Sequence, residues 1–310
     1  ERFYDNTGIK TDANIYAKLN YAVNENINAF GDLQYRHINY EMSGKDYKTM
    51  PDGSKKILDQ NHNFDFINPK AGLYYKINDR MNAYASFAIG NREPTRTHFK
   101  DATGDPNITP KPETLFDYEF GYDFKSKYLA AGVNLYYMDY HNQLVPTGEK
   151  SSVGYDIMTN VKDSYRRGVE FMTSLNYENM ILWDFNLTLS QNKINNFTYW
   201  ASYYDENWNE DYSPETVKET DIAFSPSVIG NTRLQYNYKD FISIALISKY
   251  VGEQYFDNLS SDERKLDPYW INDLELSYKL KTNLFSEINF KLQLNNVLDN
   301  KYISNAYGGV

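Results

Sequence analysis

Apolar and polar residues alternate with a period of two in segment after segment of this chain, and no other feature constrains its fold more. In the clearest segment the two faces are Phe116, Tyr118, Phe120, Tyr122 and Phe124 against Asp117, Glu119, Gly121 and Asp123. Because successive side chains of a β-strand point to opposite faces, such a segment is predicted to be a strand with one apolar face. The repetition of the pattern predicts an all-β protein.

Charged residues fall on only one face of each clear segment. The same separation recurs at 129–137, 169–177, 183–190, 273–280 and 288–295. A basic residue that faces lipid at the bilayer midplane costs about 2 to 4 kcal/mol, so lipid exposure would keep the apolar faces clean. A soluble antiparallel sandwich also alternates, however, and periodicity alone leaves both folds open.

The alternating segments divide the chain into twelve expected strands. They lie at about 12–22, 27–41, 63–77, 81–93, 113–124, 128–143, 162–177, 181–199, 223–238, 241–254, 268–280 and 287–299. Pro69 and Pro226 fall inside two of these strands, where proline removes a ladder hydrogen bond, and both are expected near the outer strand ends.

Connection lengths separate the two folds. Every second connection is a short turn, at 23–26, 78–80, 125–127, 178–180, 239–240 and 281–286. The others are long, polar and aromatic, near 42–62, 94–112, 144–161, 200–222 and 255–267. Strict alternation of short and long connections favours a transmembrane antiparallel β-barrel with tight periplasmic turns and long outer loops.

Composition agrees with a barrel and excludes several other classes. The chain has 30 Tyr, 17 Phe and 4 Trp, and tyrosine suits a boundary between water and lipid. Its mean hydropathy of -0.70 excludes a helical membrane protein but not a barrel, whose strands show lipid only at every second residue. Without cysteine there is no disulfide or thiol chemistry, and a net charge of -10 argues against a nucleic-acid partner.

A series of motifs along nearly the whole chain resembles the barrel region of TonB-dependent receptors. The motifs are Asn91-Arg-Glu-Pro-Thr-Arg96, Asp105-Pro-Asn-Ile-Thr-Pro-Lys-Pro-Glu113, Tyr118-Glu-Phe-Gly-Tyr122, Leu135-Tyr-Tyr-Met-Asp-Tyr140, Ser164-Tyr-Arg-Arg-Gly-Val-Glu-Phe171, Leu266-Asp-Pro-Tyr-Trp-Ile-Asn-Asp273 and Leu294-Asn-Asn-Val-Leu-Asp-Asn-Lys-Tyr302. Their order and spacing together are more specific than any one of them.

The resemblance implies a barrel of about 22 strands that is plugged by an N-terminal domain. Residues 1–310 would then be a single partial domain, the C-terminal portion of that barrel, with about 12 strands corresponding roughly to strands 10 to 21. The remaining strands are expected outside this chain, because open strand edges cannot be left in lipid. The plug is expected outside it as well. The implied location is the outer membrane of a Gram-negative bacterium, in contact with lipid and lipopolysaccharide.

The function implied by the resemblance is active uptake of a scarce nutrient, driven by the TonB-ExbB-ExbD complex. An iron complex, either a ferric siderophore or haem, is the first expectation. The alternatives are a glycan or oligosaccharide importer that works with a surface lipoprotein, a passive porin, and an adhesin-like barrel that transports nothing. No P-loop, metalloprotease motif, nucleophile elbow or dinucleotide turn is present, so we expect neither an enzyme nor a cofactor.

Candidate ligand-binding residues lie in two of the long loops. His98 follows Arg96 where haem receptors of the family carry an outer-loop histidine, although an ordinary solvated histidine is the preferred interpretation. The loop at 200–222 has aromatic residues that could stack on sugars or planar ligands: Tyr203, Tyr204, Trp208 and Tyr212. Its acids show no regular spacing for Ca²⁺, so no metal site is expected.

Other charged residues are predicted on the polar, inward side of the strands. These are Asp117, Glu119, Arg233, Glu275 and Lys291. Contact with the plug is preferred over contact with the substrate, because large barrels have polar lumens. The lysines of the 42–62 loop suit an anionic siderophore or the phosphates of lipopolysaccharide, but they suit solubility equally well.

Overall fold

The computed structural model describes residues 5–49, 52–102, 109–150, 156–204, 208, 210–239 and 241–306. Its main antiparallel path, in spatial order, is β1 (Asp5–Ala22), β2 (Ile27–Thr49), β4 (Gln60–Asn78), β5 (Met81–Arg92), β6 (Glu113–Lys125), β7 (Leu129–Lys150), β8 (Asp156–Tyr177), β9 (Ile181–Tyr204), β11 (Val228–Tyr238), β12 (Ile242–Val251), β15 (Tyr269–Leu280) and β16 (Ile288–Leu294). Off this path, β3 (Lys55–Ile57) pairs with β2, and β10 (Glu210–Asp221) pairs with β9. The path confirms the twelve predicted strands.

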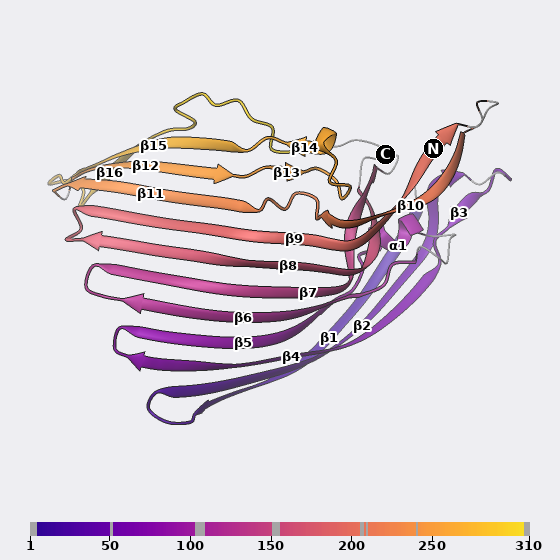
Figure 1. The fold of residues 1–310 in the computed structure, drawn as a ribbon, viewed down its shortest axis with the longest axis horizontal. Coiled ribbons are helices and arrows are strands. Elements are labelled where there is room, and N and C mark those ends of the chain that lie inside the picture. Colours follow the sequence, from indigo (N-terminus) through magenta and orange to yellow (C-terminus); the bar gives the residue numbers. More distant parts are fainter. Residues whose placement is uncertain are drawn as a thin grey trace.

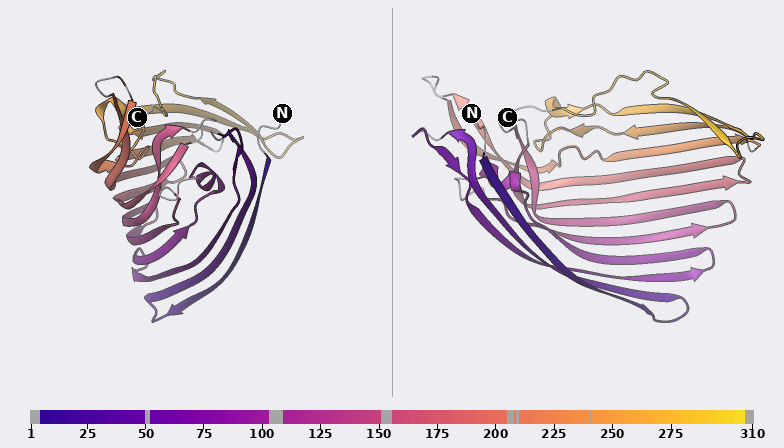
Figure 2. Two further views of the ribbon diagram at one scale, coloured as in Figure 1. Left: turned by 90° about the vertical axis from the view of Figure 1, so that its right-hand side faces the viewer. Right: turned by 180° about the vertical axis from the view of Figure 1, so that it is seen from behind.

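The sheet is open and strongly curved (Figures 1 and 2). Within the described residues, β1 and β16 are the two ends of the strand path and do not pair with each other. The short turns gather at one end of the sheet, and the long connections gather at the other. This arrangement is that of a barrel wall, in which each strand pairs with its sequence neighbours.

The alternating pattern divides the sheet into an apolar convex face and a polar concave face. On β6 the rings of Tyr118 and Phe120 are exposed, whereas Asp117 and Glu119 are half-buried on the opposite face. The neighbouring strands also place polar side chains on the concave face, since Glu119 pairs with Ser86 on β5 and with Tyr136 on β7. The exposed apolar face is the one predicted to contact lipid.

Gly121 permits a close contact across the concave face. The Tyr84 hydroxyl on β5 donates to Asn134 Oδ1 on β7 at 3.1 Å, and its ring passes over Gly121 of the intervening strand. A Cβ at residue 121 would lie 2.1 Å from the Tyr84 ring. Only glycine leaves room for this crossing.

At the end with long connections the strands run further than predicted. The expected loops at 42–62, 144–161 and 200–222 are largely strand, because β2 continues to Thr49, β7 to Lys150 and β9 to Tyr204. Cross-strand hydrogen bonds such as that of Tyr199 with Glu215 stabilise the extensions. Alternation of apolar and polar residues arises where one face of a strand contacts lipid. It could therefore not predict the parts of these strands that continue into water.

Other boundaries also differ from the prediction. The segment at 94–112 contains a short helix, α1 (Arg96–Ala102), whose Phe99 is buried. The 255–267 connection contains β13 (Gln254–Tyr255), the 3-10 turn η2 (Asp262–Arg264) and β14 (Lys265–Leu266). Within the described ranges, no helix has the length and apolar character needed to cross a membrane.

The two prolines have different outcomes. Pro69 lies inside β4 opposite Leu33 of β2, and the pairing of β4 with β5 stops at the next residue, Lys70. The missing N–H is therefore tolerated where the second ladder ends. Pro226 precedes β11, so the predicted start of that strand at 223 is wrong.

A small apolar core lies among the outer strand extensions. Val145, Val161, Ile194, Phe197 and Ile222 form this cluster, with Leu259 packed against it. The 252–268 connection folds over it, because fully buried Asn258 accepts from the Ala223 amide at 2.8 Å and donates to the Pro146 carbonyl at 2.6 Å. The outer end of the sheet is thus packed rather than a fringe of solvated loops.

Candidate functional site

The concave face of β6 to β8 carries a group of acidic residues. Asp117, Glu119 and Asp123 project from β6 and Glu170 from β8, with Ser86 donating to Glu119 at 3.4 Å. Asn134, between them on β7, donates to Glu170 at 3.4 Å. The two predicted inward acids of this group, Asp117 and Glu119, therefore lie on one polar wall.

The other three predicted inward residues meet in one ionic cluster. Glu275 of β15 accepts from Arg233 Nη2 of β11 at 2.8 Å and from Lys291 Nζ of β16 at 2.6 Å. Only 10% of the Glu275 side chain is exposed, whereas 57% of that of Lys291 is. One carboxylate thus joins three strands on the concave face, since Arg233 reaches across β12.

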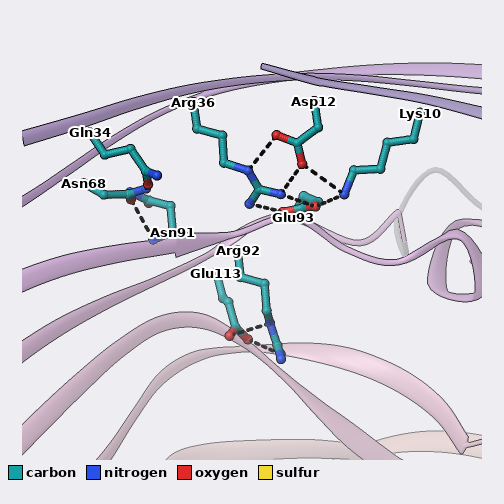
Figure 3. A network of polar contacts seen from close by, with 9 residues as sticks. All are labelled: Lys10, Asp12, Gln34, Arg36, Asn68, Asn91, Arg92, Glu93 and Glu113. Atoms are coloured by element: carbon teal, nitrogen blue, oxygen red, sulfur yellow. Dashed lines mark hydrogen bonds and ion pairs between the residues drawn. The ribbon is translucent and has the colours of Figure 1, made fainter. Parts of the chain in front are cut away.

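A second ionic network lies at the outer end, where the β5–β6 connection meets β1 and β2 (Figure 3). Arg36 contacts Asp12 at 2.6 Å and Glu93 at 3.1 Å, and Lys10 contacts Glu93 at 2.6 Å. Glu93 comes just after β5, which is separated from β1 by β2 and β4 in the sheet. The network therefore bends the start of the connection over the concave face.

The base of the same connection is closed by a bidentate ion pair. Arg92 and Glu113 are register partners, and their side chains meet at 2.8 and 2.9 Å (Figure 3). Glu113, which is buried, also accepts from the Leu144 amide at 3.1 Å. Two parallel hydrogen bonds fix the orientation as well as the distance, so the connection leaves and rejoins the sheet at a defined point.

Helix α1 is anchored in this connection by a cluster of aromatic rings. Phe99 is 1% exposed and stacks on His62 of β4 with ring centroids 3.7 Å apart. Tyr40 of β2 and Phe64 of β4 each lie 6.3 Å from Phe99. Burial lowers the pKa of His62, so its ring stays neutral against Phe99 at neutral pH.

The two candidate ligand residues of α1 have different surroundings. Arg96 is exposed at the start of the helix, whereas His98 is half-buried and accepts a hydrogen bond at Nδ1 from the Thr95 amide at 3.2 Å. Tyr40, His62 and Phe99 were missed by the sequence reasoning. The only available signal was Phe99, an isolated apolar ring in a polar connection.

The other candidate ligand residues lie on the β9–β10 hairpin. Tyr203 donates to its register partner Asp211 at 2.9 Å, and Trp208 at the tip is 83% exposed. Tyr204 and Tyr212 lie in the strands, but their side chains fall outside the described part. Among the described residues, no group of three His, Asp or Glu is arranged to hold a metal ion.

The chain matches a family model over nearly its whole length. The model, described as the β-barrel of TonB dependent receptor-like proteins, matches residues 2–297. The chain belongs to this family. The predicted resemblance is therefore confirmed, and the curved sheet is part of a TonB-dependent receptor barrel.

Solved structures share the fold of this receptor barrel at low sequence identity. They include the ferric-catecholate import receptor Fiu from E. coli K12 (TM-score 0.73, 18% identity, 97% of this chain and 42% of that one). The siderophore receptor PiuA from Acinetobacter baumannii has a TM-score of 0.74 at 15% identity (98% and 41%). The copper transporter OprC also reaches 0.74 at 15% (96% and 43%). The chain thus spans less than half the length of these proteins.

Proposed function

We propose that this chain is most of the C-terminal half of the barrel of an outer-membrane receptor that actively imports a scarce nutrient, most simply an iron complex. The observation that carries the proposal is the set of charged residues on the concave face, which runs from Asp117, Glu119 and the Glu275 cluster to the ionic network of Arg36 and Glu93 at the outer end. A ferric-catecholate import receptor and a siderophore receptor with the same fold support the choice of cargo. The partners in this proposal are a plug domain, the remaining strands and the TonB-ExbB-ExbD complex.

The convex face supports a place in the outer membrane. Phe87, Tyr118 and Tyr137 form a row across β5, β6 and β7, with ring centroids 4.9 and 6.3 Å apart. Tyr165 on β8 continues it, and Arg167 lies 5.2 Å from that ring. Tyrosine and arginine side chains suit the boundary between acyl chains and headgroups, so this row faces lipid and lipopolysaccharide.

Iron uptake by cells tests the proposal. The full-length receptor, expressed in a strain that lacks its other iron receptors, should take up radiolabelled iron from ferric siderophores, and a protonophore should abolish this uptake. A porin would instead give passive flux and salt-dependent single-channel conductance with the protonophore present. An adhesin would give surface binding without uptake.

A glycan importer is the second candidate, and two exposed rings favour it. Trp200 and Trp208 on the outer hairpin are 59% and 83% exposed, and exposed indoles stack on sugar rings. Such an importer would work with a surface lipoprotein. Growth on an oligosaccharide that is lost when both residues are changed to Ala, with iron uptake absent throughout, would establish the glycan function.

Haem is the iron complex for which His98 would be the ligand. The hydrogen bond from the Thr95 amide occupies Nδ1, which favours a local structural role for the ring. We expect the Soret band of receptor-bound haem to be the same in the wild type and in His98→Ala. A shift that depends on His98 would instead assign haem ligation to this residue.

A further inference from the structure

The hydroxyl group of Tyr40 is held ready for a partner that the described protein does not supply. Tyr40 is 8% exposed, and its ring packs with Phe99 and Met42. Its hydroxyl oxygen is buried, and no described protein group forms a hydrogen bond with it. Because nearly all buried polar groups in native proteins are paired, a fixed hydroxyl of this kind points to a ligand.

Arg96 lies beside this hydroxyl. A Cβ at Gly8 of β1 would be 3.3 Å from Tyr40 Oη and 3.6 Å from Arg96 Nε. The phenol and the guanidinium therefore both lie close to Gly8, and a larger side chain at this position would press against both of them. Gly8, Tyr40 and Arg96 come from three separate parts of the chain, β1, β2 and α1, which the fold brings together.

The charge at this point favours an anion. In the neighbouring network, Lys10 and Arg36 are matched by Asp12 and Glu93. Arg96 is exposed and has no ion pair in the described ranges of the chain. Burial raises the pKa of Tyr40, so its hydroxyl remains protonated at neutral pH and can donate.

We propose that Tyr40 and Arg96 form an oxyanion subsite at the outer mouth, where both donate to one carboxylate or catecholate oxygen of the imported iron complex. The inference rests on the proposed iron uptake. Arg96 is the mobile half of the subsite, since it is exposed, and swings aside to admit the oxygen. Tyr40 is the fixed half, because Phe99 and Met42 hold its ring.

Binding to the purified full-length receptor tests the subsite. The probes are ferric citrate, the ferric complex of dihydroxybenzoate and a neutral ferric hydroxamate, followed by tryptophan fluorescence. Tyr40→Phe and Arg96→Gln should each weaken binding of the two anionic complexes about tenfold or more. The affinity of the double variant should fall by less than the product of the two single fold-changes, because both residues bind the same oxygen. Binding of the neutral hydroxamate should not change.

Tyr35→Phe is the matched control. Tyr35 lies on the same strand but on the opposite face, where its hydroxyl donates to Asp65 at 2.7 Å, so this variant should bind every complex as the wild type does. Unchanged binding of both anionic complexes by Tyr40→Phe would overturn the subsite, while wild-type uptake would leave the proposed function intact.

A probe without iron distinguishes failure of the subsite from failure of the proposed iron uptake. With fluorotyrosine at position 40, the fluorine resonance should shift when citrate alone is added, and Arg96→Gln should reduce that shift. If the wild type binds none of the iron complexes, the proposed function fails, and the citrate titration still decides the subsite. A resonance that citrate does not move would mean that water alone satisfies the hydroxyl, which overturns the subsite.

Discussion

The ring of Phe99 lies against the ring of His62, with an interplanar angle of 16° and centroids 3.7 Å apart. This stacking joins α1 to the wall of the sheet and holds the β5–β6 connection over the concave face. Glu93 anchors the start of the same connection through Arg36 and Lys10. The position of α1 therefore depends on the rings packed around Phe99 and on the ion pairs at the start of the connection.

Removing the Phe99 ring should release α1 without unfolding the barrel. Phe99→Ala deletes a buried ring, a change that costs about 3 to 5 kcal/mol, and here the loss falls on local packing. Hydrogen exchange of residues 96–102 in the full-length receptor should become much faster. Phe285→Ala, which removes a ring that is 56% exposed, is the control and should leave this exchange unchanged. Equal protection of α1 in both variants would contradict the anchoring role.

The stacked histidine predicts a dependence of α1 on pH. Burial holds the pKa of His62 below its usual value of about 6.5, so folded receptor binds fewer protons there than unfolded chain. The stabilisation is complete above pH 6.5 and is lost as the pH falls through the lower folded value. Protection of the Phe99 amide should therefore decrease as the pH is lowered below about 6.5. His62→Phe, which keeps a ring but cannot ionise, should remove this dependence.

Neutralising Glu275 should destabilise the barrel wall. Glu275→Gln leaves Arg233 and Lys291 facing each other without a carboxylate. Since Lys291 is more than half exposed, we expect a loss of about 1 to 3 kcal/mol rather than the larger cost of a fully buried pair. Thermal unfolding of the receptor in detergent measures it. Adding Lys291→Met should recover part of the loss, whereas Lys301→Ala at an exposed site should have no effect. A melting temperature unchanged by Glu275→Gln would refute this account.

The crossing of Tyr84 over Gly121 predicts a steric effect. Gly121→Ala places a Cβ 2.1 Å from the Tyr84 ring, and overpacking of this kind costs about 1 to 3 kcal/mol. The folded fraction on heat-modifiability gels should fall. Gly31→Ala is the matched control, because nothing lies within 4 Å of its added methyl group. If Tyr84→Ala does not rescue Gly121→Ala, the ring is not the cause.

Predictions from sequence were reliable where residues face lipid. Alternation at Phe116 to Phe124 located β6, and the short turns located the end of the sheet where strands reverse. They failed for the outer extensions, where Tyr199 and Glu215 pair across a hairpin in water and no lipid keeps either face apolar. The helix around Phe99 was also missed, because one buried ring in seven residues gives no period.

By itself, the sequence determined the architecture of this protein, including twelve strands, their alternating faces and their order. This was possible because lipid contact imposes a period that local residues record. The tertiary structure alone decided which charges meet, such as Glu275 with Arg233 and Lys291, and which groups converge at the outer mouth. Tyr40, Gly8 and Arg96 lie on different elements, so only the register of β1 with β2 and the inward fold of α1 bring them together.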